Sequence, residues 1–358
     1  MPRPSPRSPK DAARQGLLRV ARATDALRCG RPVVIEGFTV LAVETATDQM
    51  IAARCASRRL LVLSHARART LKIRLYTPDV VALPVAKAMR ASELRAIADP
   101  TADLATPLKG PFEALRHRLP PSLVAAVKLA KLAGLLPAAI VCKTGSRDDL
   151  SVAEVMDYEA EAAASLVLVT RARVPLEGAE HTELAAFRSG DGAPENYAII
   201  INKPAPPGPV LARLHSECFT GDLLGSLKCD CGAQLRGAVQ TISQAGGGVL
   251  LYLAQEGRGI GLINKLRAYR LQDQGFDTLE ANERLGFEAD ERLYALAARM
   301  LALLGYRSVR LLTNNPDKVA ALEAAGIAVA ERVPHAFPDN VHNRAYLQTK
   351  RVKAGHLL

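Results

Sequence analysis

The chain has 358 residues, enough for about two domains, and 49% of them are hydrophobic at a mean hydropathy of +0.04. These values are typical of a folded chain with sizeable cores, and no run of 18 or more apolar residues is present to span a membrane. The formal net charge is +11, and residues 1–168 carry most of it, with 25 basic and 16 acidic residues. This half could attract nucleic acid or a phosphorylated metabolite, but its Arg and Lys are scattered and the chain has no Trp, which favours a solvated surface.

The N-terminus contains prolines and basic residues but no apolar stretch, so it does not read as a secretory signal, and we expect a flexible tail of about 12 residues. Without a signal we expect the reducing cytoplasm, where clustered cysteines bind metal or do chemistry more often than they cross-link. Cys29, Cys55 and Cys142 are isolated among apolar residues, and we expect them to be core cysteines.

In the first half, hydrophobic periodicity predicts an amphipathic helix closed by Gly30 and then a pair of strands. Two further helices alternate with two strands, and we expect a domain boundary near the last of these strands, so that the domains are 1–168 and 169–358. The predicted helices are 17–30, 122–136 and 152–164, and the predicted strands lie within 31–44, 137–142 and 165–170.

In the second half, strands and helices alternate in a way that is typical of crossover connections. The predicted fold class is α/β (α+β), with two domains that are each a mixed sheet with flanking helices. The strands are expected at 182–189, 196–203, 249–254, 308–313 and 327–333, and the helices from Gly232 and at 262–275, 289–305 and 317–326.

Three cysteines lie within fourteen residues of the second half, at Cys218, Cys229 and Cys231. This spacing is compatible with a disulfide, with a structural metal site and with a catalytic metal site. Zinc explains it best, because thiolates suit zinc, and no second pair of Cys or His ligands completes a zinc finger. We therefore expect three protein ligands and an open position for water, with His215 as an alternative fourth ligand.

A glycine-rich stretch, "AQEGRGIGLINK", follows an apolar strand and opens a helix. Its glycines would let backbone N–H groups converge on an anion at the helix N-terminus, although such a stretch is as often only a turn. Glu256 could accept hydrogen bonds from a base edge, and Arg258 could clamp phosphate. In "LLTNNPDK", Lys318 falls in the first turn of another helix and could also hold phosphate.

The stretches "RLHSECFTGDLLGSLKCDCGAQL", "QEGRGIGLINKLRAYRLQDQGFDTLEANERLGFEADERLY", "VRLLTNNPDKV" and "YLQTKRVKAGHLL" resemble GTP cyclohydrolase II. The resemblance runs over about residues 169–358. It implies hydrolysis of GTP in the first committed step of riboflavin synthesis, with the imidazole ring opened at C8. Formate, pyrophosphate and 2,5-diamino-6-hydroxy-4-(5-phosphoribosylamino)pyrimidine would be the products.

The resemblance also implies roles for individual residues. Cys218, Cys229 and Cys231 match the ligands of one zinc ion, Asp290 the proton acceptor, Arg292 the nucleophile and Tyr269 a tyrosine near the opened ring. Magnesium is expected with GTP, although we find no signature for its ligands; a homodimer is expected, and neither nucleic acid nor membrane is expected as a partner. The GTP-binding positions would be Arg213, Leu214, His215, Ser216, Glu217, Gln234, Glu256, Gly257, Arg258, Thr278, Thr313 and Lys318.

The first half resembles 3,4-dihydroxy-2-butanone 4-phosphate synthase less closely, in "CGRPVVI" and "AAVKLAKLAGLLPAAIVCK". The acid-rich motif of that family should follow Ile35, where this chain has "EGFTVLAV". Its Gly-His-Thr-Glu motif is replaced by Pro-Ser-Leu-Val at 121–124, and the glutamate expected after Cys142 is Lys143. We therefore expect a degenerate synthase domain without the metal-binding carboxylates.

Three alternatives stay open at this point. A bifunctional riboflavin enzyme would keep both activities, but the missing carboxylates count against it. A cyclohydrolase paralogue of another pathway would hydrolyse GTP to a different extent. A zinc-containing nucleic-acid-binding regulator is compatible with the basic first half, but Asp290 and Arg292 argue against it.

Overall fold

The computed structural model describes residues 9–56, 58–144, 149–204, 208–338, 341, 343, 348, 351–352 and 355. The chain forms two compact units, and the division is not a single cut. The N-terminal unit combines residues 1–161 with 263–291, and the C-terminal unit combines 162–262 with 292–358. The boundary predicted at 168/169 concerns domains that are continuous in sequence, and it stays a prediction. The tail expected at the N-terminus lies mostly outside the described residues, and a helix has begun by Pro9.

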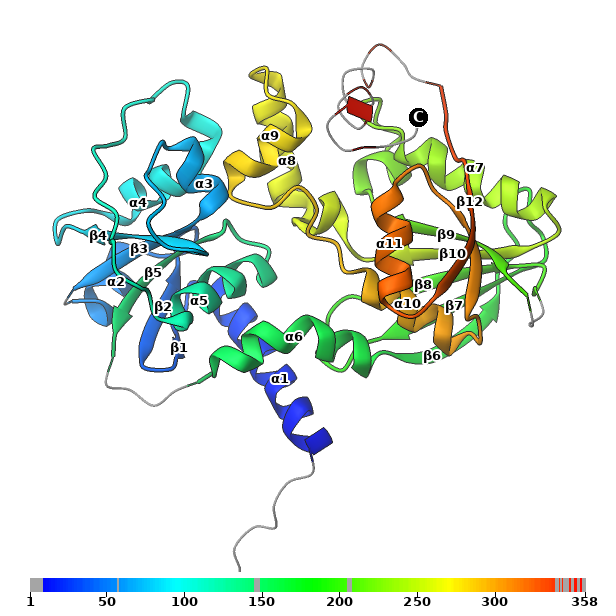
Figure 1. The fold of residues 1–358 in the computed structure, drawn as a ribbon, viewed down its shortest axis with the longest axis horizontal. Helices are drawn as coiled ribbons and strands as arrows, with labels where there is room; N and C mark the ends of the chain where they lie inside the picture. The colour runs from blue at the N-terminus through cyan, green and yellow to red at the C-terminus, as the bar shows by residue number, and fades with distance from the viewer. Residues whose placement is uncertain are drawn as a thin grey trace, which may run out of the picture. The chain divides into compact units, whose positions relative to one another are not determined.

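The N-terminal unit contains a five-stranded sheet in the order β1-β2-β5-β3-β4 (Figure 1). Helices α1 and α5 pack against it through buried side chains that include Leu27, Leu123 and Leu129. The strands are β1 (Val33–Ile35), β2 (Phe38–Ala42), β3 (Arg59–Ser64), β4 (Val80–Val85) and β5 (Ala138–Lys143). The helices are α1 (Pro9–Arg28), α2 (Asp48–Arg54), α3 (His65–Thr70), α4 (Ala91–Ala98) and α5 (Pro121–Leu132), and α6 (Val152–Ser165) runs from this unit into the next.

The α/β fold class is confirmed, but the expectation of a mixed sheet is wrong for this unit. Every pairing between its strands is antiparallel. The β1–β2 connection gives part of the reason, because Glu36 and Gly37 both have positive φ (41° and 79°), as a two-residue hairpin turn requires. Periodicity identifies a strand but carries no information on its direction.

Two helices from later in the chain also belong to the N-terminal unit: α8 (Gly261–Asp273), nearly all of which lies within it, and α9 (Thr278–Leu285). Asp277 caps α9 by accepting hydrogen bonds from Leu279 N and Glu280 N, and α9 packs beside α3 (Figure 1). The helix ends at Gly286, whose φ of 93° favours glycine.

The C-terminal unit contains a seven-stranded mixed sheet in the order β12-β11-β9-β10-β8-β7-β6. The neighbours β10, β9, β11 and β12 are parallel, so the carboxyl ends of β9, β10 and β11 lie at one edge. The strands are β6 (Val167–Arg173), β7 (Thr182–Arg188), β8 (Asn196–Ile201), β9 (Val210–Ser216), β10 (Gly248–Leu253), β11 (Ser308–Leu312) and β12 (Ala328–Val333). The helices are α7 (Cys231–Gln244), α10 (Tyr294–Leu303) and α11 (Pro316–Ala324).

The helix expected at 289–305 is shorter than predicted, because α10 begins only at Tyr294. Leu293 is extended, and the side chain of Gln255 pairs with its backbone. Leu293 N donates to Gln255 Oε1 at 3.0 Å, and Gln255 Nε2 donates to the Leu293 carbonyl at 3.1 Å. This pairing holds the residue before α10 out of the helix.

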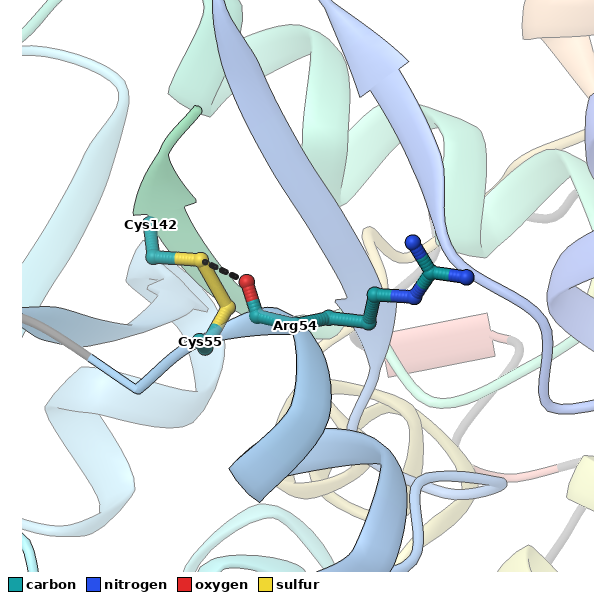
Figure 2. Close-up of a disulfide and its surroundings, with 3 residues drawn as sticks. All are labelled: Arg54, Cys55 and Cys142. Atoms are coloured by element: carbon teal, nitrogen blue, oxygen red, sulfur yellow. Dashed lines mark hydrogen bonds between the residues drawn. A yellow bond between two sulfur atoms is a disulfide. The ribbon is translucent and has the colours of Figure 1, made fainter. Parts of the chain in front are cut away.

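The expectation for the three isolated cysteines is wrong in two respects. Cys55, just after α2, and Cys142, on β5, form a disulfide with an S–S distance of 2.04 Å (Figure 2). The Cys142 sulfur lies 3.3 Å from the Arg54 carbonyl oxygen. Both half-cystines are buried, whereas Cys29 is exposed. The two partners are 87 residues apart in sequence, and the pairing of β5 with β3 places Cys142 beside Arg59, close to the end of α2 in sequence.

Within the described ranges, no helix combines the length and the hydropathy needed to cross a bilayer.

Candidate active site

The three clustered cysteines converge at the carboxyl edge of the parallel strands. Cys218 follows β9 and caps a π-helical turn at Phe219–Leu223, and Cys231 is the first residue of α7. The three sulfur atoms lie within 4.8 Å of one another, and Cys218 Sγ is 3.7 Å from Cys229 Sγ. A tetrahedral zinc ion with Zn–S bonds of about 2.3 Å would separate its sulfur ligands by about 3.8 Å. The donor set and its spacing therefore fit zinc.

Two glycines allow the close packing of the cysteine loop. A Cβ atom at Gly221 would lie 2.8 Å from Cys229 Sγ, 2.9 Å from Cys231 Cβ and 3.0 Å from Cys218 Sγ. A Cβ atom at Gly232 would lie 2.3 Å from the Gly221 carbonyl oxygen. Gly221 N also donates a hydrogen bond to Cys218 Sγ at 3.2 Å. The motif thus needs glycine at both positions, at Gly221 because the backbone approaches the sulfurs and at Gly232 because it approaches the Gly221 carbonyl.

The Asp222 carboxylate connects the cysteine loop to the sheet. It accepts hydrogen bonds from Cys218 N at 3.0 Å, from Tyr252 Oη at 3.0 Å and from His215 Nε2 at 3.0 Å. The His215 and Tyr252 rings are stacked, with centroids 5.6 Å apart. One carboxylate therefore fixes the backbone of the first metal ligand and two rings on neighbouring parallel strands.

Burial favours the neutral form of His215. Burial lowers its pKa, and this effect outweighs the neighbouring Asp222 carboxylate, which raises it. A carboxylate only accepts, so Nε2 carries the proton and Nδ1 is left as an acceptor. The pKa of Tyr252 is shifted upwards instead, because burial and the charge of Asp222 both favour its neutral hydroxyl.

Buried cationic side chains lie at the same strand edge. Arg213 on β9 is 5% exposed and donates to the Leu312 carbonyl at 2.8 Å and to Gln234 Oε1. Burial, and to a smaller extent the nearby Arg292 cation, lowers the pKa of Arg213 to about 10. Lys318 on α11 is 7% exposed and donates to the Leu214 carbonyl at 3.1 Å. The C-terminal unit thus concentrates positive charge beside the thiols, as an anionic ligand requires.

The glycine-rich stretch forms a tight turn after β10, at Glu256–Gly259. Gly257 and Arg258 both have positive φ (63° and 62°), and Glu256 Oε2 accepts from Phe219 N at 2.6 Å. This hydrogen bond joins the turn to the cysteine loop. Glu256, which the sequence analysis offers as an acceptor for a base edge, is 7% exposed and also accepts a hydrogen bond from Gly257 N at 3.1 Å through Oε1.

The predicted site residues are divided between the two units. The C-terminal unit brings together the thiols, the end of β9, the Glu256 turn and the β11–α11 turn. Tyr269 on α8, Thr278 on α9 and Asp290 belong to the N-terminal unit. The predicted residues of the C-terminal unit are Arg213, Leu214, His215, Ser216, Glu217, Cys218, Cys229, Cys231, Gln234, Glu256, Gly257, Arg258, Arg292, Thr313 and Lys318.

Sequence reasoning missed Asp222, Tyr252 and His335 as members of this region. His335 N donates to Asn314 Oδ1 at 2.9 Å, and the ring Nε2 of His335 lies 2.9 Å from the Gln234 carbonyl oxygen. The acid four residues after Cys218 was a usable signal, since short polar side chains often bind nearby backbone N–H groups. Tyr252 and His335 carried no local signal.

Comparison with known proteins shows the family of the chain. A family model described as GTP cyclohydrolase II matches residues 168–334. A GTP cyclohydrolase-2 from Azospirillum brasilense is 49% identical over 94% of this chain and 93% of its own length. A GTP cyclohydrolase-2 from Pseudomonas aeruginosa is 55% identical over 54% of this chain and 94% of its own length. The riboflavin biosynthesis protein RibBA of Bacillus cereus is 45% identical over 65% of this chain and 64% of its own length. With such similarity along nearly its whole length, the chain belongs to the GTP cyclohydrolase II family.

Proposed function

We propose that this protein is a zinc-dependent GTP cyclohydrolase II. It hydrolyses GTP, opens the imidazole ring at C8 and gives formate, pyrophosphate and 2,5-diamino-6-hydroxy-4-(5-phosphoribosylamino)pyrimidine for riboflavin synthesis. The observation that carries the proposal is the convergence of three thiols beside buried cationic side chains at one edge of a parallel sheet. Open α/β sheets bind ligands at this edge.

Cys218, Cys229 and Cys231 would hold the zinc ion. Zinc held there supplies Lewis-acid chemistry for hydrolytic attack on the ring. Among the described residues, the group of Cys, His, Asp or Glu side chains that could hold a metal ion is the thiol cluster, which we assign to zinc. We therefore propose that magnesium binds together with the triphosphate of GTP. We propose a homodimer in the cytoplasm.

The residues of the C-terminal unit would bind the nucleotide. Lys318 and Arg258 supply positive charge for phosphate oxygens, and Glu256 offers carboxylate oxygens to a base edge. His215, held neutral and fixed by Asp222, presents Nδ1 as an acceptor and cannot repel the zinc ion as an imidazolium would. Asp222 thereby keeps one acceptor in a fixed orientation beside the metal ligands.

Arg292 would attack the α-phosphorus and release pyrophosphate, and Asp290 would accept a proton. The pKa of arginine makes it a poor nucleophile unless a base and tight geometry help. On a helix, the side chains of residues two apart point in directions that differ by about 200°. Asp290 and Arg292 precede α10, so this helical divergence does not apply to them.

The purified protein, incubated with GTP and magnesium, should release formate and pyrophosphate in equal amounts and contain about one zinc per chain. Arg292→Ala should abolish pyrophosphate release, with zinc content and thermal stability unchanged. Arg310→Ala is the matched control, because Arg310 is also half-buried and pairs with Glu331 on the neighbouring strand β12. Near wild-type pyrophosphate release by Arg292→Ala would reduce Arg292 to a phosphate clamp, and absence of formate from the wild type would refute the proposed function.

A further inference from the structure

Residues 263–291 belong to the N-terminal unit although they lie within the part of the chain that matches the cyclohydrolase family. This segment carries three of the residues to which we give roles in GTP hydrolysis: Tyr269, Thr278 and Asp290. Its position must therefore be set by contacts with residues 1–161, and these contacts are specific.

The first contact is a carboxylate–guanidinium pair. Arg267 on α8 donates to both oxygens of Glu44, from Nη1 at 3.0 Å and from Nη2 at 2.9 Å. Glu44 itself is fixed, because its Oε2 also accepts from Leu136 N at 2.9 Å. The Glu44 and Arg267 side chains are 14% and 20% exposed. A bidentate, partly buried pair of this kind fixes orientation as well as distance.

Buried groups near the start and near the end of the segment also hold it. Asn264, which is fully buried, donates from Nδ2 to the Gly134 carbonyl at 3.0 Å. Leu285 and Phe287 are each 1% exposed. Between them, Gly286 lies so close to α3 that a Cβ atom there would be 2.8 Å from Ser64 Oγ. The turn after α9 is thus packed directly against the start of α3.

The far end of the segment is tied by Lys131 on α5. Lys131 Nζ lies 2.6 Å from Glu291 Oε1, and the same oxygen accepts from Glu288 N at 2.8 Å. Glu291 is the residue between Asp290 and Arg292. An anchor therefore sits next to the two residues for which we propose the covalent chemistry.

We infer that the N-terminal unit acts as a scaffold for GTP hydrolysis, and that Glu44 and Lys131 are positioning residues that hold residues 263–291. This inference rests on the proposed function. It gives the degenerate synthase-like region a role that requires no synthase chemistry: its surface orients a segment of the cyclohydrolase part. We assign neither residue a contact with the reacting groups, so we expect their effect on turnover to pass through the segment.

The chain offers a matched pair of lysines to test the inference. Lys131 and Lys128 both lie on α5 and both have side chains that are 21% exposed and paired with a glutamate. Lys128 pairs with Glu159 on α6, outside the 263–291 segment. Lys131→Met and Lys128→Met in the full-length protein therefore remove the same charge and keep a similar stem, but only the first releases Glu291.

Two measurements decide the outcome. In Lys131→Met and in Glu44→Gln, we expect amides of residues 264–291 to exchange hydrogen at least fivefold faster, and kcat/KM for GTP to fall about tenfold. Zinc content and exchange in 210–245 should not change, and Lys128→Met should match the wild type in every readout.

Unchanged exchange in 264–291 would overturn the scaffold, and so would faster exchange with turnover equal to that of Lys128→Met, because the contacts would then be structural only. A wild-type protein that releases no formate is a different failure. It would refute the proposed function, and the exchange data would still report whether Glu44 and Lys131 hold the segment.

Discussion

Replacement of Gly221 by alanine should remove zinc from the protein, because the added methyl group would enter the space among the three sulfur atoms. The backbone conformation is not the obstacle, since Gly221 is not among the residues with positive φ. The obstacle is contact: the new Cβ atom would lie 2.8 Å, 2.9 Å and 3.0 Å from atoms of Cys229, Cys231 and Cys218.

The size of the effect follows from these distances. Non-bonded carbon atoms are in optimal contact at about 3.5–4.0 Å, and sulfur is larger, so the sulfurs must retreat by roughly 0.5–1 Å. A metal site tolerates deviations of only about 0.2 Å in its ligand distances. Changes in groups around a metal site cost about 10–100-fold in affinity, and a direct intrusion should reach the upper end, which corresponds to about 2.8 kcal/mol.

The assay is zinc content per chain after desalting, followed by competition with a chromogenic chelator. Gly225→Asn is the control, because Gly225 lies in the same loop with nothing within 4 Å of its Cβ position, and Asn tolerates its φ of 64°. Melting temperature should be measured for both variants, so that loss of zinc can be separated from global unfolding.

If Gly221→Ala keeps one zinc per chain and resists the chelator as the wild type does, the three sulfurs do not form the metal site at the geometry described. If both variants lose zinc equally, the loop as a whole is sensitive and the crowding at Gly221 is not the cause.

Three further predictions concern other parts of the molecule. Asp222→Asn should lose zinc to a chelator about tenfold faster, because an amide cannot accept from Cys218 N, His215 and Tyr252 together; wild-type loss rates would contradict this. Burial lowers the pKa of His335 in the folded protein to about 4, whereas the unfolded chain keeps a histidine pKa of about 6.5. Between these two pH values the unfolded chain binds a proton that the folded protein does not, so the free energy of unfolding decreases as the pH falls from about 6.5 to 4. His335→Phe should therefore lose less melting temperature than the wild type between pH 7 and pH 5, and an equal loss would count against this titration. The N-terminal unit should form no dihydroxybutanone phosphate from ribulose 5-phosphate and magnesium, because apolar residues, Ser or Lys replace the carboxylates of the synthase motifs; product above a blank would restore the bifunctional alternative.

Much of the fold follows from local sequence patterns. The helix closed by Gly30, the strands around Gly37 and the alternation after Gly232 are confirmed because each has a strong period and a turn residue at its end. The region between α2 and α5 was not assigned, and its short helices α3 and α4 offer too few turns to show a period. Strand direction and the Cys55–Cys142 pairing depend on contacts across the sheet, so no local pattern specifies them.

Part of the site could also be predicted, because it too depends on local sequence patterns. The metal ligands are recognisable because three thiols so close in sequence form a donor set that suits zinc. The hydrogen bonds of Asp222 could not be predicted, because they join residues from β9, the cysteine loop and β10. Tyr252, for example, is 30 residues from Asp222 in the sequence. The attachment of 263–291 to the N-terminal unit was equally invisible, since Glu44 and Arg267 are 223 residues apart.

The residues before α10 show how such distant contacts overrule a local preference. Four of the five residues at 289–293 (Ala, Glu, Arg and Leu) are good helix formers, so the sequence favours continuing the helix upstream through them. The Gln255 amide instead satisfies both backbone groups of Leu293, and the Glu291 carboxylate is taken by Glu288 N and Lys131. A helix here would gain a few tenths of a kcal/mol per residue from propensity, whereas each lost hydrogen bond would cost about 1 kcal/mol. The tertiary contacts win, and they leave Asp290 and Arg292 on a non-helical segment, which is the condition that a shared role for these two side chains requires.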